Sequence, residues 1–246
     1  MRQALARLRG DALFRWRSPE PTRVEAFSDA AFAFALTLLV VSLEVPSTSQ
    51  ELLQAMRGIP AFAASFAVLT WIWYQHYLFF QRYGVTDLFV VILNAVLVFL
   101  VLIYVYPLKF LFSAVAGVTQ ITGSLADARA LHLLYSGGFF LVFAVLLVLH
   151  LHVWRLRDQL ELDVVERSIT RYEIRHSWIT MAVAALSVGL SYVPGIDLRL
   201  PGMAYFLLGP AHGLHGFFSG RSWSRLAAER GETSNAPDAS EEPART

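Results

Sequence analysis

The chain has 246 residues, of which 56% are hydrophobic and only 16% are charged, and its mean hydropathy is +0.50. The apolar residues fall in long blocks that are too continuous for half-exposed helices or alternating strands, which excludes an ordinary soluble domain. The absence of cysteine excludes disulfides, thiolate metal sites and cysteine nucleophiles, and the formal net charge of +1 by itself indicates little.

The N-terminal segment, residues 1–21, contains arginines interspersed with apolar residues. These apolar residues are Leu5, Leu8, Leu13, Phe14 and Trp16. The segment has no apolar core followed by a small-residue cleavage site, so it is not typical of a signal peptide. The pattern predicts a basic amphipathic helix lying on the inner surface of a membrane.

Six candidate membrane-spanning helices appear with a window of about 20 residues. They lie near 24–45, 60–80, 87–113, 130–154, 176–194 and 200–218. The sequence therefore predicts an all-α integral membrane protein with a six-helix transmembrane domain over 22–218. The polar residues 219–246 are predicted to form a disordered tail.

The distribution of basic residues predicts the orientation of these spans. Six spans place both termini on one side of the membrane. Of the 20 lysines and arginines, the opposite side holds four: Arg57, Lys109, Arg129 and Arg199. Because cytoplasmic loops carry the excess of positive charge, we expect both termini to be cytoplasmic.

The first span presents two different faces. At about 100° per residue, one narrow stripe of the helix contains six residues. They are Arg23, Ala30, Phe34, Thr37, Val41 and Glu44. Ser28 lies nearly opposite this stripe and Asp29 about a quarter-turn from it. Because buried polar groups need partners, we expect Ser28 and Asp29 to face neighbouring helices, which leaves the stripe available for another surface.

The content of the stripe suits a pore. From Arg23 to Glu44 the helix rises about 32 Å, close to the hydrocarbon thickness of a bilayer. If several copies surrounded an axis, Phe34 would form an apolar constriction, Thr37 a ring of hydroxyls and Glu44 a cation-attracting outer mouth. The chain has no tandem repeat, so such symmetry requires oligomerisation. The alternative is that Phe34 and Val41 simply pack against a neighbouring helix.

The residues Arg-Val-Glu-Ala-Phe-Ser-Asp at 23–29, followed by "AAFAFALTLLV", resemble the first-helix signature of the lysosomal potassium channel family (transmembrane protein 175) in its single-repeat bacterial form. The similarity continues through 71–110, where a tryptophan and a histidine are followed by an aspartate, an asparagine and a proline. It covers about 22–113, beyond which only the six-span layout agrees.

This resemblance implies a homotetramer in a bacterial inner membrane, with the first helix lining a central potassium-permeable pore. The family's narrowest point is a large aliphatic residue five positions after the motif aspartate, with a threonine three positions further on. Those positions are Phe34 and Thr37, so the threonine matches and the phenylalanine departs from the usual isoleucine or leucine. No cofactor is implied other than the permeant potassium ion, and no nucleic acid is expected as a partner.

The resemblance also implies a supporting hydrogen-bond network around the motif residues Arg23, Phe27, Ser28 and Asp29. Ser28 and Asp29 are expected to bond polar residues of the second and third helices. The candidates are Trp71, Trp73, His76 and Asn94. We hypothesise that this network holds the first helix in position.

Two other functions remain as alternatives. A secondary transporter or proton-coupled cation carrier would use Asp29 and His76 as a relay, although the chain lacks the internal repeat typical of such proteins. A membrane-embedded enzyme is disfavoured because no nucleophile or metal constellation is present, so no catalytic residues or metal ligands are predicted. Four histidines in two pairs are interpreted as interfacial side chains: His150, His152, His212 and His215.

Three arginines repeat every four residues before the fifth span: Arg167, Arg171 and Arg175. A voltage sensor would carry its arginines at every third position inside the apolar span. We therefore predict a helix surface at the inner face of the membrane. The predicted acidic partners are Glu161, Asp163 and Glu166.

Overall fold

The computed structural model describes residues 13–18, 20–41, 47–115, 124–195 and 199–234. Within these ranges all regular secondary structure is helical. The long helices are α2 (Arg23–Val41), α4 (Ile59–Tyr83), α5 (Leu88–Val115), α6 (Leu125–Arg155), α7 (Val164–Ser191) and α9 (Leu208–Ser234). The short ones are α3 (Ser49–Arg57), α8 (Arg199–Met203) and the 3-10 helix η2 (Ala204–Leu207). The all-α prediction is therefore confirmed for the described part of the chain.

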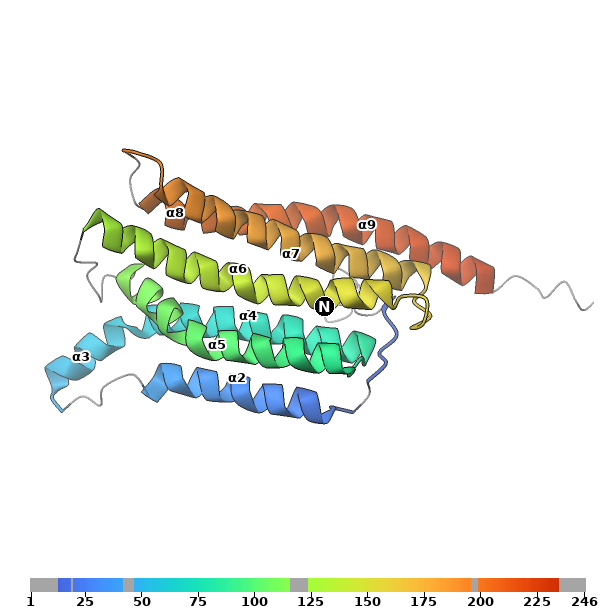
Figure 1. The fold of residues 1–246 in the computed structure, drawn as a ribbon, viewed down its shortest axis with the longest axis horizontal. Coiled ribbons are helices and arrows are strands. Elements are labelled where there is room, and N and C mark those ends of the chain that lie inside the picture. Colours follow the sequence, from blue (N-terminus) through green and yellow to red (C-terminus); the bar gives the residue numbers. More distant parts are fainter. Residues whose placement is uncertain (1–12, 19, 42–46, 116–123, 196–198, 235–246) are drawn as a thin grey trace, which may run out of the picture.

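The long helices form a bundle in which α2 lies at one edge and α7 and α9 lie at the other (Figure 1). Helix α2 packs against α4 and α5, α5 packs against α6, and α6 packs against α7. Gly138 of α6 lies against the ring of Tyr104 of α5, and a Cβ at this position would lie only 2.5 Å from Cδ2 of Tyr104. The edge position of α2 leaves part of its surface uncovered within one chain.

In the described part of the chain, three helices are long and apolar enough to cross a membrane: Arg23–Val41, Leu88–Ala114 and Ala126–Arg155. The pair Ser49–Arg57 and Ile59–Tyr83, bent by 43°, adds a fourth span if the pair is counted as one. Helices α7 and α9 are less apolar. The lower hydropathy of α7 comes from polar residues such as Glu173, Thr180 and Ser187, whose side chains are buried inside the bundle.

Helices α7 and α9 extend beyond the spans predicted for them. Helix α7 begins at Val164, before the predicted span 176–194, and Asp163 and Glu166 form a capping box at its N-terminus. Helix α9 continues to Ser234, so residues 219–234 are not a disordered tail. Trp223 explains this extension, since it is 1% exposed and packs edge-on against Tyr172 at a ring-centroid distance of 5.0 Å. Residues 235–246 lie outside the described residues.

The N-terminal segment is described only from residue 13, so most of the predicted amphipathic helix lies outside the described residues. Residues 14–18 are not helical. Phe14 is 5% exposed and its ring meets that of Tyr83 edge-on at 5.3 Å, while the Arg17 backbone N–H donates to the Gln81 carbonyl at 3.1 Å. This part of the chain is therefore inserted against the end of α4.

Candidate functional site

One face of α2 holds the helix in the bundle. Its buried side chains follow a spacing of three and four residues, which places them on a single face. They are Glu25, Ser28, Phe32, Ala35 and Leu39. This face packs against α4 and α5.

The other face of α2 is exposed in the single chain. It contains the described members of the predicted stripe: Arg23, Ala30, Phe34, Thr37 and Val41. Phe34 is 57% exposed and Val41 is 71% exposed, and Phe27 on the same side is 61% exposed. Glu44, the predicted outer mouth, lies outside the described residues. The stripe, which includes the large apolar side chains of Phe34 and Val41, is thus a surface that the bundle itself does not cover.

A buried hydrogen-bond chain connects α2, α4 and α5. The Asn94 amide donates from Nδ2 to Ser28 Oγ at 2.8 Å, and the Ser28 hydroxyl donates to the Val24 carbonyl at 2.9 Å. His76 Nε2 lies 2.8 Å from Asn94 Oδ1, and because an amide oxygen only accepts, Nε2 carries the proton. Ser28, His76 and Asn94 are each at most 2% exposed. The structure therefore brings together three of the predicted network residues.

Asp29 is bonded to Trp73 and not to Trp71. The Trp73 indole Nε1–H donates to Asp29 Oδ1 at 2.7 Å. Residues two positions apart on a helix point in nearly opposite directions. Trp71 accordingly points away from α2 and packs against Phe143 of α6 at a ring-centroid distance of 5.1 Å. The inclusion of Trp71 in the network was wrong.

The Ser28 hydroxyl allows a matched test of this network. In Ser28→Ala the buried Asn94 Nδ2–H loses its acceptor, so we expect the protein to be destabilised by about 1–3 kcal/mol. Ser65 is also fully buried, but its hydroxyl bonds only the Ala61 carbonyl of its own helix. Ser65→Ala should therefore change stability by less than about 0.5 kcal/mol.

Both variants are measured by thermal unfolding in detergent, followed by tryptophan fluorescence. Equal melting temperatures for Ser28→Ala and Ser65→Ala would contradict a stabilising role for the inter-helix bond. The two variants make the same chemical change, because each removes one buried serine hydroxyl, and only the hydroxyl of Ser28 bonds a neighbouring helix.

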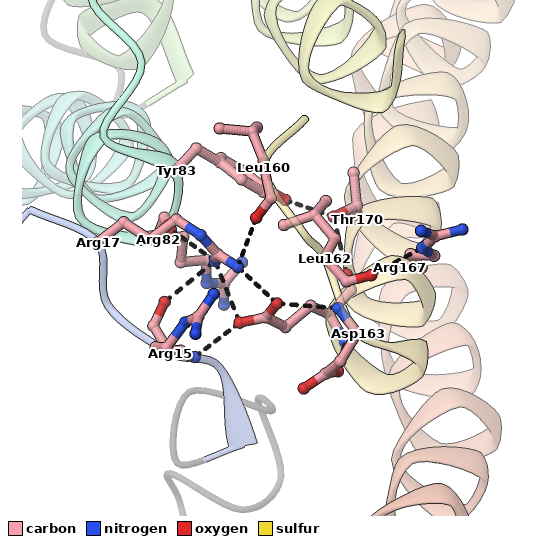
Figure 2. A network of polar contacts seen from close by, with 10 residues as sticks. Arg15, Arg17, Arg82, Tyr83, Leu160, Leu162, Asp163, Arg167 and Thr170 are labelled. Carbon is pink, nitrogen blue, oxygen red and sulfur yellow. Dashed lines mark hydrogen bonds and ion pairs between the residues drawn. The ribbon is translucent and has the colours of Figure 1, made fainter. Parts of the chain in front are cut away.

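A second polar cluster, missed by the sequence reasoning, ties the N-terminal segment to α7 (Figure 2). Glu166 accepts hydrogen bonds from the Arg15 backbone N–H at 3.0 Å and from Arg17 Nη1 and Nη2 at 3.1 Å and 2.7 Å. The Glu166 side chain is 2% exposed and that of Arg17 is 13% exposed. This ion pair holds residues 13–18 against the helix bundle.

The same cluster ties the end of α4 to α7. Arg82 Nη1 lies 2.7 Å from Glu173 Oε1, with side chains 2% and 8% exposed, and the Tyr83 and Thr170 hydroxyls lie 2.8 Å apart. These partners are about 90 residues apart in the chain. The one local signal was the spacing of Asp163 and Glu166, which is that of a capping box.

The arginine series has a partner that was not predicted. Arg167 pairs with Asp158 at 2.7 Å, and Glu166, one of the predicted partners, is bonded to Arg17. Arg171 lies over the ring of Trp154 at 5.4 Å from its centroid. The end of α6 therefore faces this part of α7.

The histidines occupy different environments. His150 is 4% exposed and therefore lies inside the bundle, and its Nδ1 lies 2.8 Å from the Leu146 carbonyl of its own helix. His152 Nε2 lies 2.6 Å from Asp87 Oδ2. His212 stacks on His176 at a centroid distance of 3.8 Å. Among the described residues, no group of three or more histidine, aspartate or glutamate side chains has the arrangement of a metal site.

Comparisons with known proteins agree with the first-helix motif and the bundle. The model of the endosomal/lysosomal potassium channel TMEM175 family matches residues 23–107. A potassium channel from Marivirga tractuosa is 33% identical over 230 residues, which cover 87% of this chain and 93% of that protein. The crystal structure of a variant of the potassium channel MtTMEM175, in complex with a nanobody fusion protein, is 33% identical. It covers 86% of this chain and 97% of that one with a TM-score of 0.72.

A more distant structure, the lysosomal potassium-selective channel TMEM175 homolog from Chamaesiphon minutus, shares the fold. It is 24% identical, covers 79% of this chain and 96% of that one, and has a TM-score of 0.56. The Marivirga tractuosa relative is similar over nearly the whole length of both proteins, and the family model begins at the motif arginine, Arg23. The chain therefore belongs to the TMEM175 family.

Proposed function

We propose that the chain is one subunit of a homotetrameric, potassium-permeable channel in a bacterial inner membrane, with α2 lining the central pore. One observation carries the proposal: the α2 face that contains Phe34 and Thr37 is exposed, while the opposite face is bonded to the bundle through Ser28. The similarity of this chain to proteins that are named potassium channels supports potassium as the permeant ion.

In this proposal six helices cross the membrane: α2, α4, α5, α6, α7 and α9. Residues 13–18 and the C-terminal end of α9 lie toward the same end of the bundle, which supports termini on one side (Figure 1). The excess of arginine on that side supports a cytoplasmic location. Helix α7 can span the bilayer although it is less apolar, because its buried polar side chains face other helices and not the lipid.

The pore surface consists of Ala30, Phe34, Thr37 and Val41 from each of four copies, with Glu44 at the outer mouth. Four copies of Phe34 form a hydrophobic constriction that gates by excluding water. Thr37 donates its hydroxyl proton to the Ala33 carbonyl at 2.8 Å. Its oxygen lone pairs are then directed away from the helix, where they interact with a passing cation.

The buried bonds of α2 set the direction in which this surface points. Ser28 is bonded to Asn94, Asn94 to His76, and Asp29 to Trp73. A rotation of α2 about its own axis breaks these bonds inside the bundle, where unsatisfied polar groups are costly. We infer that the network keeps Phe34 and Thr37 on the pore axis.

Potassium flux into liposomes that contain the purified protein tests the proposal. A channel gives passive flux that follows the potassium gradient and does not saturate at low millimolar concentration. A carrier that used Asp29 and His76 would instead give saturable, proton-coupled flux. Native mass spectrometry of the same preparation measures the number of subunits, and any assembly other than a tetramer contradicts the proposed pore.

A further inference from the structure

A pocket of about 240 Å³ is lined by residues of α7 and α9. These two helices lie at the edge of the bundle opposite α2 (Figure 1). Its polar side chains come from one face of each helix, at spacings of three and four residues. They are Ser168, Arg171 and Arg175 on α7 and His215, Ser219 and Ser222 on α9. A cavity of about 150 Å³ is enough to hold a benzene ring, so this pocket has room for a phosphate group and part of its ester.

The charge of the pocket is one-sided. Its lining contains two arginines, three serines and no aspartate or glutamate. Arg171 and Arg175 are four residues apart on one helix, so their positive charges repel each other. Both side chains are exposed. A bound anion would relieve this repulsion and accept hydrogen bonds from the guanidinium groups and the serine hydroxyls.

The position of the pocket along α7 and α9 places it at the depth of the membrane–water interface. Arg171 and Arg175 come just before the apolar part of α7, which begins near 176, and Ser219 and Ser222 come just after the apolar part of α9, which ends near 218. Arg171 lies over Trp154, and tryptophan is enriched at membrane–water interfaces. The proposed topology places this level in the cytoplasmic leaflet.

The pocket also has an apolar flank. Phe218 lines it and is 65% exposed, and Leu214, one turn earlier on α9, is 60% exposed. A free phosphate has no apolar group that could pack against this surface, whereas the acyl chains of a lipid can cover it. Tyr172 also lines the pocket and stacks on His215 at a centroid distance of 4.3 Å.

We propose that this pocket binds the phosphate-bearing headgroup of an anionic phospholipid from the cytoplasmic leaflet. The inference rests on the proposed membrane topology but not on ion conduction. Basic pockets between membrane helices on the cytoplasmic side attract such headgroups because anionic lipids are concentrated there. Arg171 and Arg175 bind the phosphate, the serine hydroxyls donate to it, and Phe218 contacts the acyl chains.

The test measures lipid binding to the purified protein in detergent by native mass spectrometry. Phosphatidylglycerol is compared with phosphatidylcholine of the same acyl chains. We expect Arg171→Gln/Arg175→Gln to weaken phosphatidylglycerol binding by at least about tenfold and to leave phosphatidylcholine binding unchanged. The matched control, Arg221→Gln/Arg225→Gln, removes the same charge from exposed positions of α9 outside the pocket and should change binding by less than about threefold.

A second variant keeps the test valid if the double variant does not fold. Ser219→Phe fills the pocket and retains both arginines, so it should also weaken phosphatidylglycerol binding by at least about tenfold. Equal losses in the pocket and control pairs, or equal binding of the two lipids, would overturn the proposal. So would displacement of phosphatidylglycerol by glycerol 3-phosphate at equal concentration, because the ligand would then be a soluble phosphate. Binding without potassium flux would contradict the channel function alone.

Discussion

Phe34→Ala is expected to raise the passive potassium flux of liposomes containing the protein by about tenfold or more. The proposed constriction excludes water with four benzyl groups, and an apolar barrier depends on both the width and the hydrophobicity of the opening. Each 1.4 kcal/mol removed from the barrier corresponds to about a tenfold gain in rate. Phe34 is 57% exposed in the single chain, so its truncation opens no cavity inside the bundle.

The control for this variant is Phe206→Ala. Phe206 is 79% exposed and lies in η2, which packs with α7, α8 and α9. Its truncation should leave the flux unchanged within a factor of about two. Adding Thr37→Val to Phe34→Ala removes the hydroxyl ring at nearly constant shape and should lower the potassium flux again. If neither wild type nor Phe34→Ala conducts potassium, α2 does not line a potassium pore.

Glu173→Gln is expected to destabilise the protein by about 3–5 kcal/mol, because it leaves the buried Arg82 guanidinium facing a neutral amide. The two side chains are 2% and 8% exposed and their charged atoms lie 2.7 Å apart. For a chain of this size, the melting temperature should fall by on the order of 10 °C. Thermal unfolding in detergent, followed by the fluorescence of the six tryptophans, measures this shift.

An exposed ion pair provides the matched control. Asp158 is 64% exposed and pairs with Arg167 and Arg157 near the start of α7. Asp158→Asn makes the same chemical change at the surface and should cost less than about 1 kcal/mol. The double variant Arg82→Met/Glu173→Met removes both buried charges and should recover most of the lost stability. A double variant no more stable than Glu173→Gln would show that the pair does not act as a unit.

The division of α2 into a bonded face and an exposed face was predictable because it depends only on local geometry. Helical periodicity separates Ser28 from Phe34 whatever the helix packs against. The requirement that polar groups in a membrane be satisfied predicted that Ser28 and Asp29 face neighbouring helices. The family resemblance then pointed to the second and third helices, which made Asn94 and His76 candidates before any contact was known.

Helical periodicity could not decide whether Trp71 or Trp73 bonds to Asp29. Trp71 and Trp73 are two positions apart, so helical geometry requires that they point in different directions, but it does not say which one faces α2. The rotation of α4 about its axis is set by the packing of Phe79, Phe80 and their neighbours in the core. That packing turns Trp73 toward Asp29 and Trp71 toward α6.

The apolar blocks and the Arg-x-x-x-Phe-Ser-Asp motif already indicated an all-helical member of this channel family. Both are visible in the sequence because they involve only residues that are close together in the chain. The tertiary structure alone paired Arg17 with Glu166 and Arg82 with Glu173, and extended α7 and α9 beyond their apolar segments. Hydropathy marks such residues as polar and places them at the surface. In the folded bundle they are buried, because distant segments supply the opposite charges and the aromatic rings that make burial favourable.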